Sequence, residues 1–392
     1  MTTVAGAGAQ AAPQGGGGGM NPFQIATNLY AEKNLNGLVS SQLLTTSPIP
    51  GGGQINAGQY LRGTRLVVRT VTAGAGIPTT GDNPLGGYQG AANAGAQAGV
   101  FSQLDLVNVD GSEILYNMSG IAYYLGAKAF RPWLQDWATA YDFVSSATQV
   151  GFTAFLQPEI RFSACTLANT DTRSQYRWDQ SLLGFPGATT QPTISVTPYM
   201  DAWAQPDDKD LQGTANQPVP PGVNLQMKRR HQIFTLNAGG SDNVLLSALT
   251  GNAVRAMLLI TRDTTGARQA IFSDPFYWTQ DNRSLGKLNP DIITQWSNDF
   301  YSTYGKGTAF NPGPTTPGGT APSQYQLGVY PLPRFMEPGS LVGQGWLYTS
   351  NATKIQFEST SQTLGSGTPG TCELITDEVY PVGPVDPSLV DI

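Results

Sequence analysis

Residues 101–116 read FSQLDLVNVDGSEILY, and this stretch decides the fold class. Apolar and β-branched residues recur through 101–109, the pair Asp110-Gly111 follows, and the apolar pattern resumes at 114–116. An Asp-Gly pair between two apolar runs is a strong signal of a tight hairpin turn, because glycine accepts the positive φ angles that such turns require. The stretch therefore predicts two antiparallel strands joined by a short turn.

The composition of the whole chain extends this prediction. Of the 392 residues, 47 are glycine and 28 are proline, and only 12% are charged, about half of the usual share. This composition disfavours a helical bundle, which is poor in glycine and proline. A hydrophobic content of 40% is enough to build cores and excludes global disorder. We expect an all-β protein made of short strands, turns and loops.

The same order of elements occurs twice along the chain. Each half reads strand, loop, hairpin, short helix, loop and paired strands, and a polar, proline-rich linker at 205–222 separates the halves. We predict two tandem eight-stranded jelly rolls, at 55–204 and 223–382, with short helices in their loops. At roughly 150 residues, each half can bury about 70% of its unfolded surface around its own core.

Individual strands and helices are placed by apolar and β-branched runs and by capping signals. Helical spacing is present over 121–128, and Asn289 precedes a proline at the start of a second helix, whose apolar face begins at Ile292. The expected strands are 66–71, 101–109, 114–116, 151–156, 160–167, 193–199, 233–236, 256–260, 269–272, 346–349, 354–358 and 373–379.

The two ends of the chain are expected to lie outside the jelly rolls. Residues 1–54 read as a flexible glycine-rich arm followed by a short amphipathic helix, and 383–392 as an extended tail. Four apolar residues share one face of that helix: Phe23, Ala26, Leu29 and Tyr30. The face packs either on its own domain or on a membrane or neighbouring subunit. The start of the chain lacks the features of a secretory signal and no apolar run is long enough to span a membrane, so we expect folding in a cytoplasm.

Few residues that carry chemistry are present. His231 is the only histidine, which disfavours a multi-histidine zinc site or a catalytic triad and favours a polar residue at a strand start. Cys165 and Cys372 are far apart in the sequence and read as buried free thiols. The net charge of −6 and a basic run limited to 228–230 argue against nucleic-acid binding. We therefore predict no catalytic, cofactor-binding or metal-binding residues and no enzymatic activity.

Two motifs resemble ligand-binding loops but fit ordinary loops better. Residues 365–370 read GSGTPG, which fits a dinucleotide-binding loop, but a strand is expected next where that loop needs a helix. Three aspartates, at 207, 208 and 210, lack the spacing of a calcium loop and fit a solvated linker.

A resemblance to a known family can be stated on the hairpin and its continuation. Residues 101–125, FSQLDLVNVDGSEILYNMSGIAYYL, followed by a linker and a second strand–hairpin–helix unit at 255–301, resemble tectivirus-type major capsid proteins. These are double-jelly-roll coat proteins of membrane-containing bacteriophages, related in architecture to adenovirus hexon. The resemblance covers most of the chain in length, domain number and order, and the family has no diagnostic motif.

The resemblance implies a function in self-assembly. It implies a homotrimer with a pseudo-hexagonal footprint that tiles an icosahedral virion shell, with penton or minor capsid proteins as partners and no direct contact with nucleic acid. It also implies that the segment from Phe23 to Tyr30 lies beneath the shell, near an internal membrane.

Two other functions stay open at this point. A receptor- or carbohydrate-binding fibre protein would show exposed Trp or Tyr on one rim of a sandwich. A glycan hydrolase or amidase would need two converging carboxylates, for which the candidates are Glu159, Asp201, Asp207 and Asp274.

Overall fold

A computed structural model describes the chain mainly as strands. The described residues are the twenty strands given below together with residues 119, 120, 122, 123, 126, 130, 236, 252, 264, 271, 272, 289, 292, 328, 346 and 349. Among them, helical conformation occurs at six positions, 120, 122, 123, 126, 130 and 292. The predicted all-β fold is confirmed.

The strands fall into two groups along the sequence. We call residues up to Trp203 the first half, with β1 (Ile25–Ala26), β2 (Ser41–Leu43), β3 (Ile49–Asn56), β4 (Tyr60–Thr72), β5 (Phe101–Val107), β6 (Glu113–Met118), β7 (Val144–Ser146), β8 (Gln149–Gly151), β9 (Thr153–Leu156), β10 (Arg173–Gln180) and β11 (Thr193–Trp203). Residues from Leu225 form the second half, with β12 (Leu225–Thr235), β13 (Ser241–Leu245), β14 (Ala253–Asp263), β15 (Phe276–Gln280), β16 (Arg283–Leu288), β17 (Val329–Pro333), β18 (Leu347–Tyr348), β19 (Ile355–Thr360) and β20 (Pro369–Pro381).

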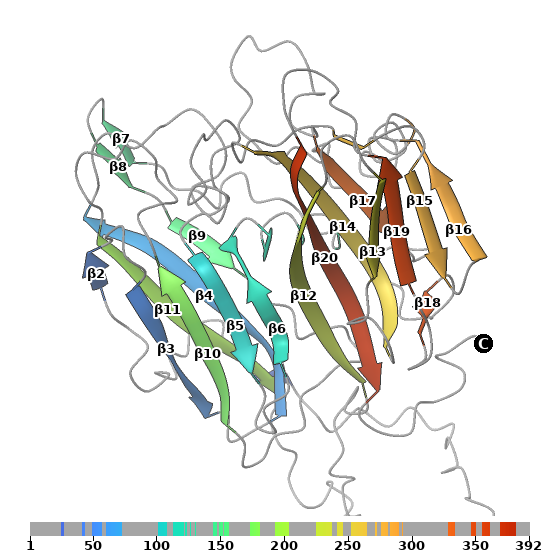
Figure 1. Cartoon of the computed structure of the whole chain (residues 1–392). Helices are drawn as coiled ribbons and strands as arrows, with labels where there is room; N and C mark the ends of the chain where they lie inside the picture. Colours follow the sequence, from blue (N-terminus) through green and yellow to red (C-terminus); the bar gives the residue numbers. More distant parts are fainter. Residues whose placement is uncertain are drawn as a thin grey trace, which may run out of the picture.

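One sheet of nine strands runs through both halves. Its order is β17-β14-β20-β12-β6-β5-β10-β3, with β18 also paired to β14. Every pairing in it is antiparallel except that of β12 with β6, where Arg229 and Arg230 lie parallel to Leu115 and Tyr116. Figure 1 shows this pairing at the centre of the molecule, where the blue-to-green first half meets the yellow-to-red second half. We call it the join.

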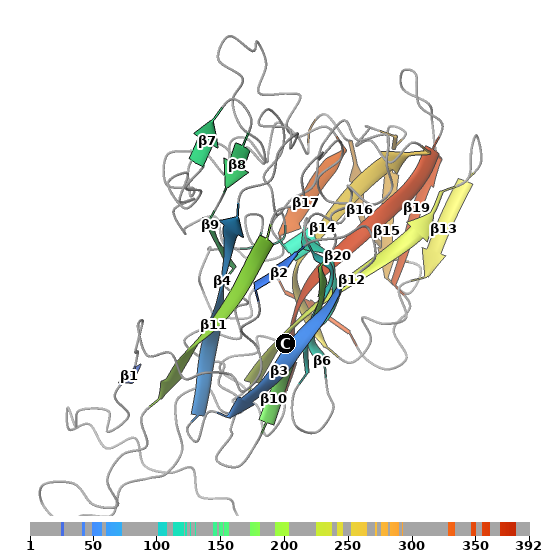
Figure 2. The same cartoon turned by 90° about the vertical axis from the view of Figure 1, so that its left-hand side faces the viewer.

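A second layer of strands faces the large sheet in each half. In the first half it is the sheet β1-β11-β4-β9, with β2 also paired to β11, and Figure 2 shows β4 and β11 standing apart from β3 and β10. In the second half it is the sheet β13-β19-β15-β16, while β7 and β8 form a separate ribbon. Two facing sheets per half are the arrangement expected of a jelly roll.

The core of the second half fills the space between its two layers. Trp278 of β15 is fully buried against Met257 and Leu259 of β14 and against Cys372 and Leu374 of β20. Successive side chains of a strand point to opposite faces, so the even-numbered residues Cys372 and Leu374 mark the core face of β20. The intervening odd-numbered residues face the other way.

The N-terminal helix prediction is wrong at the positions that the structure describes. Ile25 and Ala26 form β1, paired with Trp203 and Ala202 of β11; Phe23, Leu29 and Tyr30 lie outside the described residues. Isolated short helices are marginal in water, whereas a strand edge offers backbone hydrogen bonds to any segment that pairs with it. Strand β3 likewise begins at Ile49, inside the stretch assigned to the arm.

Most of the strongly apolar strands lie where the sequence predicts them. Predicted and observed strands overlap at β4, β5, β6, β9, β11, β12, β14, β18, β19 and β20. The expected strand at 160–167, the turn at Asp110-Gly111 and the linker at 205–222 lie outside the described residues. The division into two jelly rolls at 55–204 and 223–382 stays a prediction. In the described part of the chain, no helix is long and apolar enough to cross a membrane.

Candidate functional site: a buried charged layer at the join

Six charged or titratable side chains gather on the face of the large sheet that lies opposite the core of the second half. They come from three neighbouring strands, and we call them the charged layer: Arg229 and His231 of β12, Arg255 and Arg262 of β14, and Glu373 and Asp377 of β20. Each is at most 3% exposed. Burying charge is costly unless it is paired, so the pairing within this layer decides whether the fold is stable.

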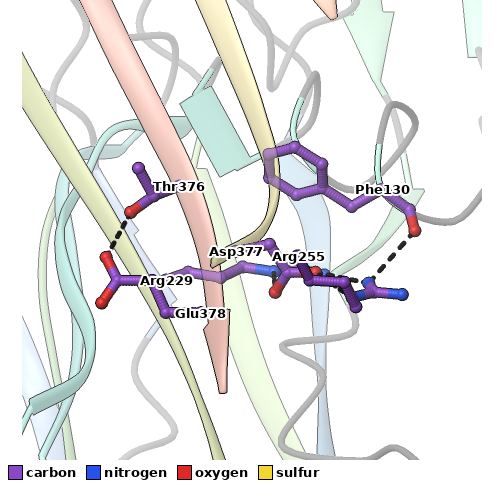
Figure 3. Close-up of polar contacts among 6 residues, drawn as sticks. All are labelled: Phe130, Arg229, Arg255, Thr376, Asp377 and Glu378. Carbon is purple, nitrogen blue, oxygen red and sulfur yellow. Dashed lines mark hydrogen bonds and ion pairs between the residues drawn. The ribbon is translucent and has the colours of Figure 1, made fainter. Parts of the chain in front are cut away.

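Asp377 is the centre of one cluster (Figure 3). Arg255 donates from Nε to Oδ2 at 2.9 Å and also from Nη2 to the same oxygen, while Nε of Arg229 lies 3.5 Å from Oδ1. The carboxylate of the middle strand is thus held by one arginine from each flanking strand. A register shift in β14 between Val254 and Ala256 allows this, because a bulge re-aims the side chain that it carries.

The same cluster reaches into the first half through Phe130. Nη2 of Arg255 donates to the backbone oxygen of Phe130 at 3.3 Å, and the guanidinium carbon of Arg229 lies 5.6 Å from the centre of the Phe130 ring. The second distance is within the range of a cation–π contact. A methyl group added at Gly126 would lie 3.3 Å from Cγ2 of Ile375, so the segment carrying Gly126 and Phe130 packs directly on the charged layer.

Glu373 is the centre of the other cluster. Arg262 donates from Nε to Oε1, and Nε2 of His231 lies 2.9 Å from Oε2. Burial alone would raise the pKa of Glu373, but the positive charge of Arg262 and the hydrogen bond and charge of His231 outweigh it and lower the pKa to about 2. Glu373 is therefore a carboxylate at any physiological pH.

His231 also bridges the join. Its Nδ1 lies 2.9 Å from the backbone oxygen of Asn117, at the end of β6. Asn117 has a positive φ of 53° at an irregular stretch of the β5–β6 pairing, and its N–H donates to Oδ1 of Asp105 at 2.6 Å. Asparagine tolerates this left-handed conformation better than most residues. The irregularity turns the Asn117 carbonyl toward β12.

A helical turn starts directly after this bulge. The hydroxyl oxygen of Ser119 accepts a hydrogen bond from the N–H of Ala122 at 3.1 Å, and its carbonyl accepts one from Tyr123 at 2.9 Å. The first is a helix N-cap. It confirms the predicted helix at this place and directs Gly126 and Phe130 onto the second half.

Glu378 lies on the core face of β20, opposite the charged layer, and its pKa shift differs from that of Glu373. It accepts hydrogen bonds from Asn252 and Thr376, and Nε of Arg230 lies 3.6 Å from Oε2. Burial raises its pKa, and the charge of Arg230 and these hydrogen bonds do not cancel the effect. The two glutamates of β20 thus shift in opposite directions.

The structure revises the interpretation of several single residues. His231 is buried in the middle of β12 and does not lie at a strand start; of the basic run, Lys228 and Arg229 are buried and Arg230 is partly exposed. Cys372 is a buried free thiol as predicted. The 365–370 motif ends inside β20, which confirms the strand interpretation.

In the part of the chain that the structure describes, the carboxylates proposed for a hydrolase are not seen to converge. Of the four carboxylates offered for a hydrolase, Asp201 lies in β11 and Glu159, Asp207 and Asp274 lie outside the described residues, as does Cys165.

The predicted cap of the second helix is confirmed, because Oδ1 of Asn289 accepts the N–H of Ile292 at 3.0 Å. Ile292 itself is 65% exposed, so its side chain is not a core contact. Among the described residues, no group of three or more acidic, histidine or cysteine side chains is placed to hold a metal ion.

The charged layer was not anticipated from the sequence, although a signal was present. Glu373, Ile375 and Asp377 lie on one face of a single strand, and Arg229 and His231 lie on one face of the strand paired with it. Opposite charges on matching faces of two paired strands indicate cross-strand pairs.

Comparison with known proteins gives a match in fold. No family model and no curated protein match the sequence. The crystal structure of STIV MCP matches with a TM-score of 0.54 at 10% identity, over 88% of this chain and 96% of that chain. The structure of Sulfolobus Turreted Icosahedral Virus matches with a TM-score of 0.53 at 11% identity, over 88% and 90%. The major capsid protein P2 of bacteriophage PM2 is more distant, with a TM-score of 0.46 at 12% identity over 88% and 97%.

The two matches with TM-scores above 0.5 each cover 88% of this chain and at least 90% of the compared chain. STIV MCP is a double-jelly-roll major capsid protein. The predicted tectivirus-type lineage and the relationship to adenovirus hexon are not tested by them. At this level of identity the finding concerns architecture, and it shows that this chain has the double-jelly-roll fold of viral major capsid proteins.

Proposed function

We propose that this chain is a major capsid protein that self-assembles into the shell of a virion. The observation that carries the proposal is the fold match to STIV MCP, which spans 88% of this chain and 96% of that chain. A fold alone does not define a function, but a second property agrees. With 12% charged residues, copies of the chain repel each other weakly when they pack side by side.

The proposed assembly unit is a homotrimer with a pseudo-hexagonal outline, formed by six jelly rolls. Such trimers would tile an icosahedral shell around an internal membrane, with penton or minor capsid proteins at special positions, in the virion of a tectivirus-type bacteriophage. Folding would take place in the host cytoplasm, and neither a cofactor nor direct contact with nucleic acid is part of the proposal. The fibre and hydrolase alternatives draw no support from the matched folds.

The proposal also assigns a role to the N-terminal segment. Phe23, Ala26, Leu29 and Tyr30 would contact the internal membrane or a neighbouring subunit. In support, β1, which includes Ala26, pairs with the end of β11 at the edge of its sheet.

The mass of the purified protein in solution tests the assembly unit. Three chains of 41.6 kDa give about 125 kDa, and size-exclusion chromatography with light scattering should report this mass at micromolar concentration. Electron microscopy of particles purified from cells that express the chain should show closed icosahedral shells. A monomer under all salt and concentration conditions, with no particles, would contradict the capsid role.

A triple variant of the full chain tests the N-terminal segment. Phe23→Ser, Leu29→Ser and Tyr30→Ser together should abolish flotation with phospholipid vesicles if the segment contacts a membrane, or lower the trimer fraction if it contacts a subunit. Unchanged flotation and unchanged mass would remove this role and leave the capsid role standing.

A further inference from the structure

His231 lies between two groups that accept hydrogen bonds. Its Nδ1 is 2.9 Å from the backbone oxygen of Asn117, and its Nε2 is 2.9 Å from Oε2 of Glu373. A backbone carbonyl has no proton to donate. The carboxyl group of Glu373 is ionised, because its other oxygen, Oε1, accepts a hydrogen bond from the buried guanidinium of Arg262.

This arrangement fixes the number of protons on the ring. A neutral imidazole has one N–H donor and one acceptor nitrogen, whereas the imidazolium ion has two donors. With an acceptor at each nitrogen, only the imidazolium makes both hydrogen bonds. The ring is 3% exposed, so water has little room to replace a bond that the protein does not supply.

The charges around the ring are compatible with a buried cation. Glu373 on β20 is the nearest, and the other charged groups with contacts described on this face include Arg229 on β12, Asp377 on β20, Arg255 and Arg262 on β14, and Asp105 on β5. Asp377 is engaged by Arg229 and Arg255, and Asp105 by the N–H of Asn117. Glu373 also binds Arg262 through Oε1, but its Oε2 lies 2.9 Å from Nε2 of His231, so it is the carboxylate in direct contact with the ring.

We propose that His231 is a protonated latch between the two halves of the chain, which ties Asn117 of the first half to Glu373 of the second and releases Asn117 when the ring loses a proton. The proton leaves to solvent. The remaining N–H stays on Nε2, where it faces a full negative charge, so Nδ1 then presents a lone pair to the lone pairs of the Asn117 oxygen. The contact that opens is therefore the one across the join.

The position of the latch gives this release a structural consequence. The described pairing of β12 with β6 consists of two residue pairs, Arg229 with Leu115 and Arg230 with Tyr116, and His231 is the next residue along β12. Histidine is the side chain whose charge normally changes between about pH 5 and 8. We expect the pairing of β12 with β6 to be more stable under mildly acidic conditions and to become less stable as the pH rises. The latch belongs to the single chain, so it does not depend on the proposed capsid role.

The wild-type protein allows a direct test, because it contains one histidine. Labelling histidine with ¹⁵N gives ring signals from His231 alone, and nuclear magnetic resonance distinguishes a ring with two N–H groups from a neutral ring. We expect two N–H groups at pH ~5.5, within the acidic range in which histidine side chains are normally charged, and a single N–H on Nε2 once the ring has lost a proton. A neutral ring at pH ~5.5, or one protonated on Nδ1 at high pH, would overturn the proposal.

Hydrogen exchange of β6 tests the release of Asn117. After correction for the intrinsic pH dependence of exchange, amide exchange in 113–118 should speed up by roughly 10- to 100-fold between pH 6 and 9, as expected for loss of one charge-assisted hydrogen bond. The variant His231→Gln has no proton to lose and should show no such rise. Asp377→Asn is the matched control, since it weakens the neighbouring cluster on the same face and leaves His231 intact, so its rise should persist. An equal rise in His231→Gln and wild type, or no rise in wild type, would refute the latch.

Discussion

Replacing Glu373 and Glu378 separately by glutamine should have opposite effects on stability. Both side chains are buried on β20, and the two substitutions keep shape while removing charge. Glu373 has a pKa lowered from 4.5 to about 2, whereas the pKa of Glu378 is raised. A carboxyl group with a lowered pKa stabilises the folded state in its charged form, and one with a raised pKa is disfavoured in its charged form.

The magnitude for Glu373 follows from its pKa. A shift from 4.5 to about 2 corresponds to about 3 kcal/mol of stability at neutral pH, since one unit is about 1.36 kcal/mol. The unfolding entropy expected for 392 residues is roughly 0.8 kcal/mol/K, so Glu373→Gln should lower the Tm by roughly 4 °C at pH 7. Glu378→Gln removes a charge that burial disfavours, so its Tm at pH 7 should equal or exceed that of the wild type.

The dependence on pH has a definite sign for each residue. The contribution of Glu373 is complete above pH ~4.5 and is lost as the pH falls toward 2, so wild type and Glu373→Gln should converge in that window. Glu378 binds a proton more tightly in the folded state, so the gain of Glu378→Gln should shrink as the pH falls toward 4.5.

Calorimetry at one protein concentration, from pH 7 down to the acid limit of solubility, measures these differences. Glu358→Gln on β19 is the control, because Glu358 is partly exposed and surface substitutions usually change stability by less than about 0.5 kcal/mol. The reasoning is wrong if Glu378→Gln is as destabilised as Glu373→Gln at pH 7, or if the two variants respond alike to acid.

Two further predictions concern the packing of the same region. Asp377→Ala leaves two buried arginines facing a missing carboxylate, so unfolding should require about 3–5 kcal/mol less in a denaturant titration, and Asp377→Asn should lose less; equal stability of Asp377→Ala and wild type would contradict the ion-pair account. Gly370→Ala places a methyl group against the backbone oxygen of Asp263 and 2.8 Å from the amide nitrogen of Thr264, so β14 and β20 must separate and the variant should be strongly destabilised. Gly126→Ala meets only the ends of the Ile375 and Phe130 side chains and gains about 1 kcal/mol of helix propensity, so its Tm should stay close to that of the wild type; similar losses in both glycine variants would show that the close approach at Gly370 does not matter.

The parts of the fold that the sequence predicted are the strands that are apolar in their own right. β14, with the run Ala-Met-Leu-Leu-Ile, and β4, with Leu-Val-Val, need no knowledge of their neighbours. β10 reads RSQYRWDQ and β17 reads VYPLP, and neither was predicted. A polar strand is recognised by its partners rather than by its own pattern, and two prolines argue against a strand unless it lies at an edge, as β17 does.

The join and its charged layer depend on contacts that are remote in sequence. His231 meets Asn117 and Glu373 across 114 and 142 residues, and a single sequence does not reveal such pairs. The N-terminal helix prediction failed for the same reason, because β1 forms by pairing with β11, a strand that is remote in the sequence. Local pattern thus identified the class of the fold, while the position of His231 needed the topology.

The charged layer solves a problem of register that apolar burial leaves open. Ten of the eleven residues of β14 are buried, on both of its faces, so its apolar side chains fit the sheet almost equally well after a shift by one residue. A one-residue slip of β20 would turn Glu373 and Asp377 into the core face beside Trp278, away from Arg262 and Arg255. An unpaired buried charge costs several kcal/mol, and the slip would leave two carboxylates and their cationic partners without each other. We infer that this chain, with few charges overall, buries the charged layer because its ion pairs fix the register of β20 against β12 and β14, which apolar burial on both faces leaves open.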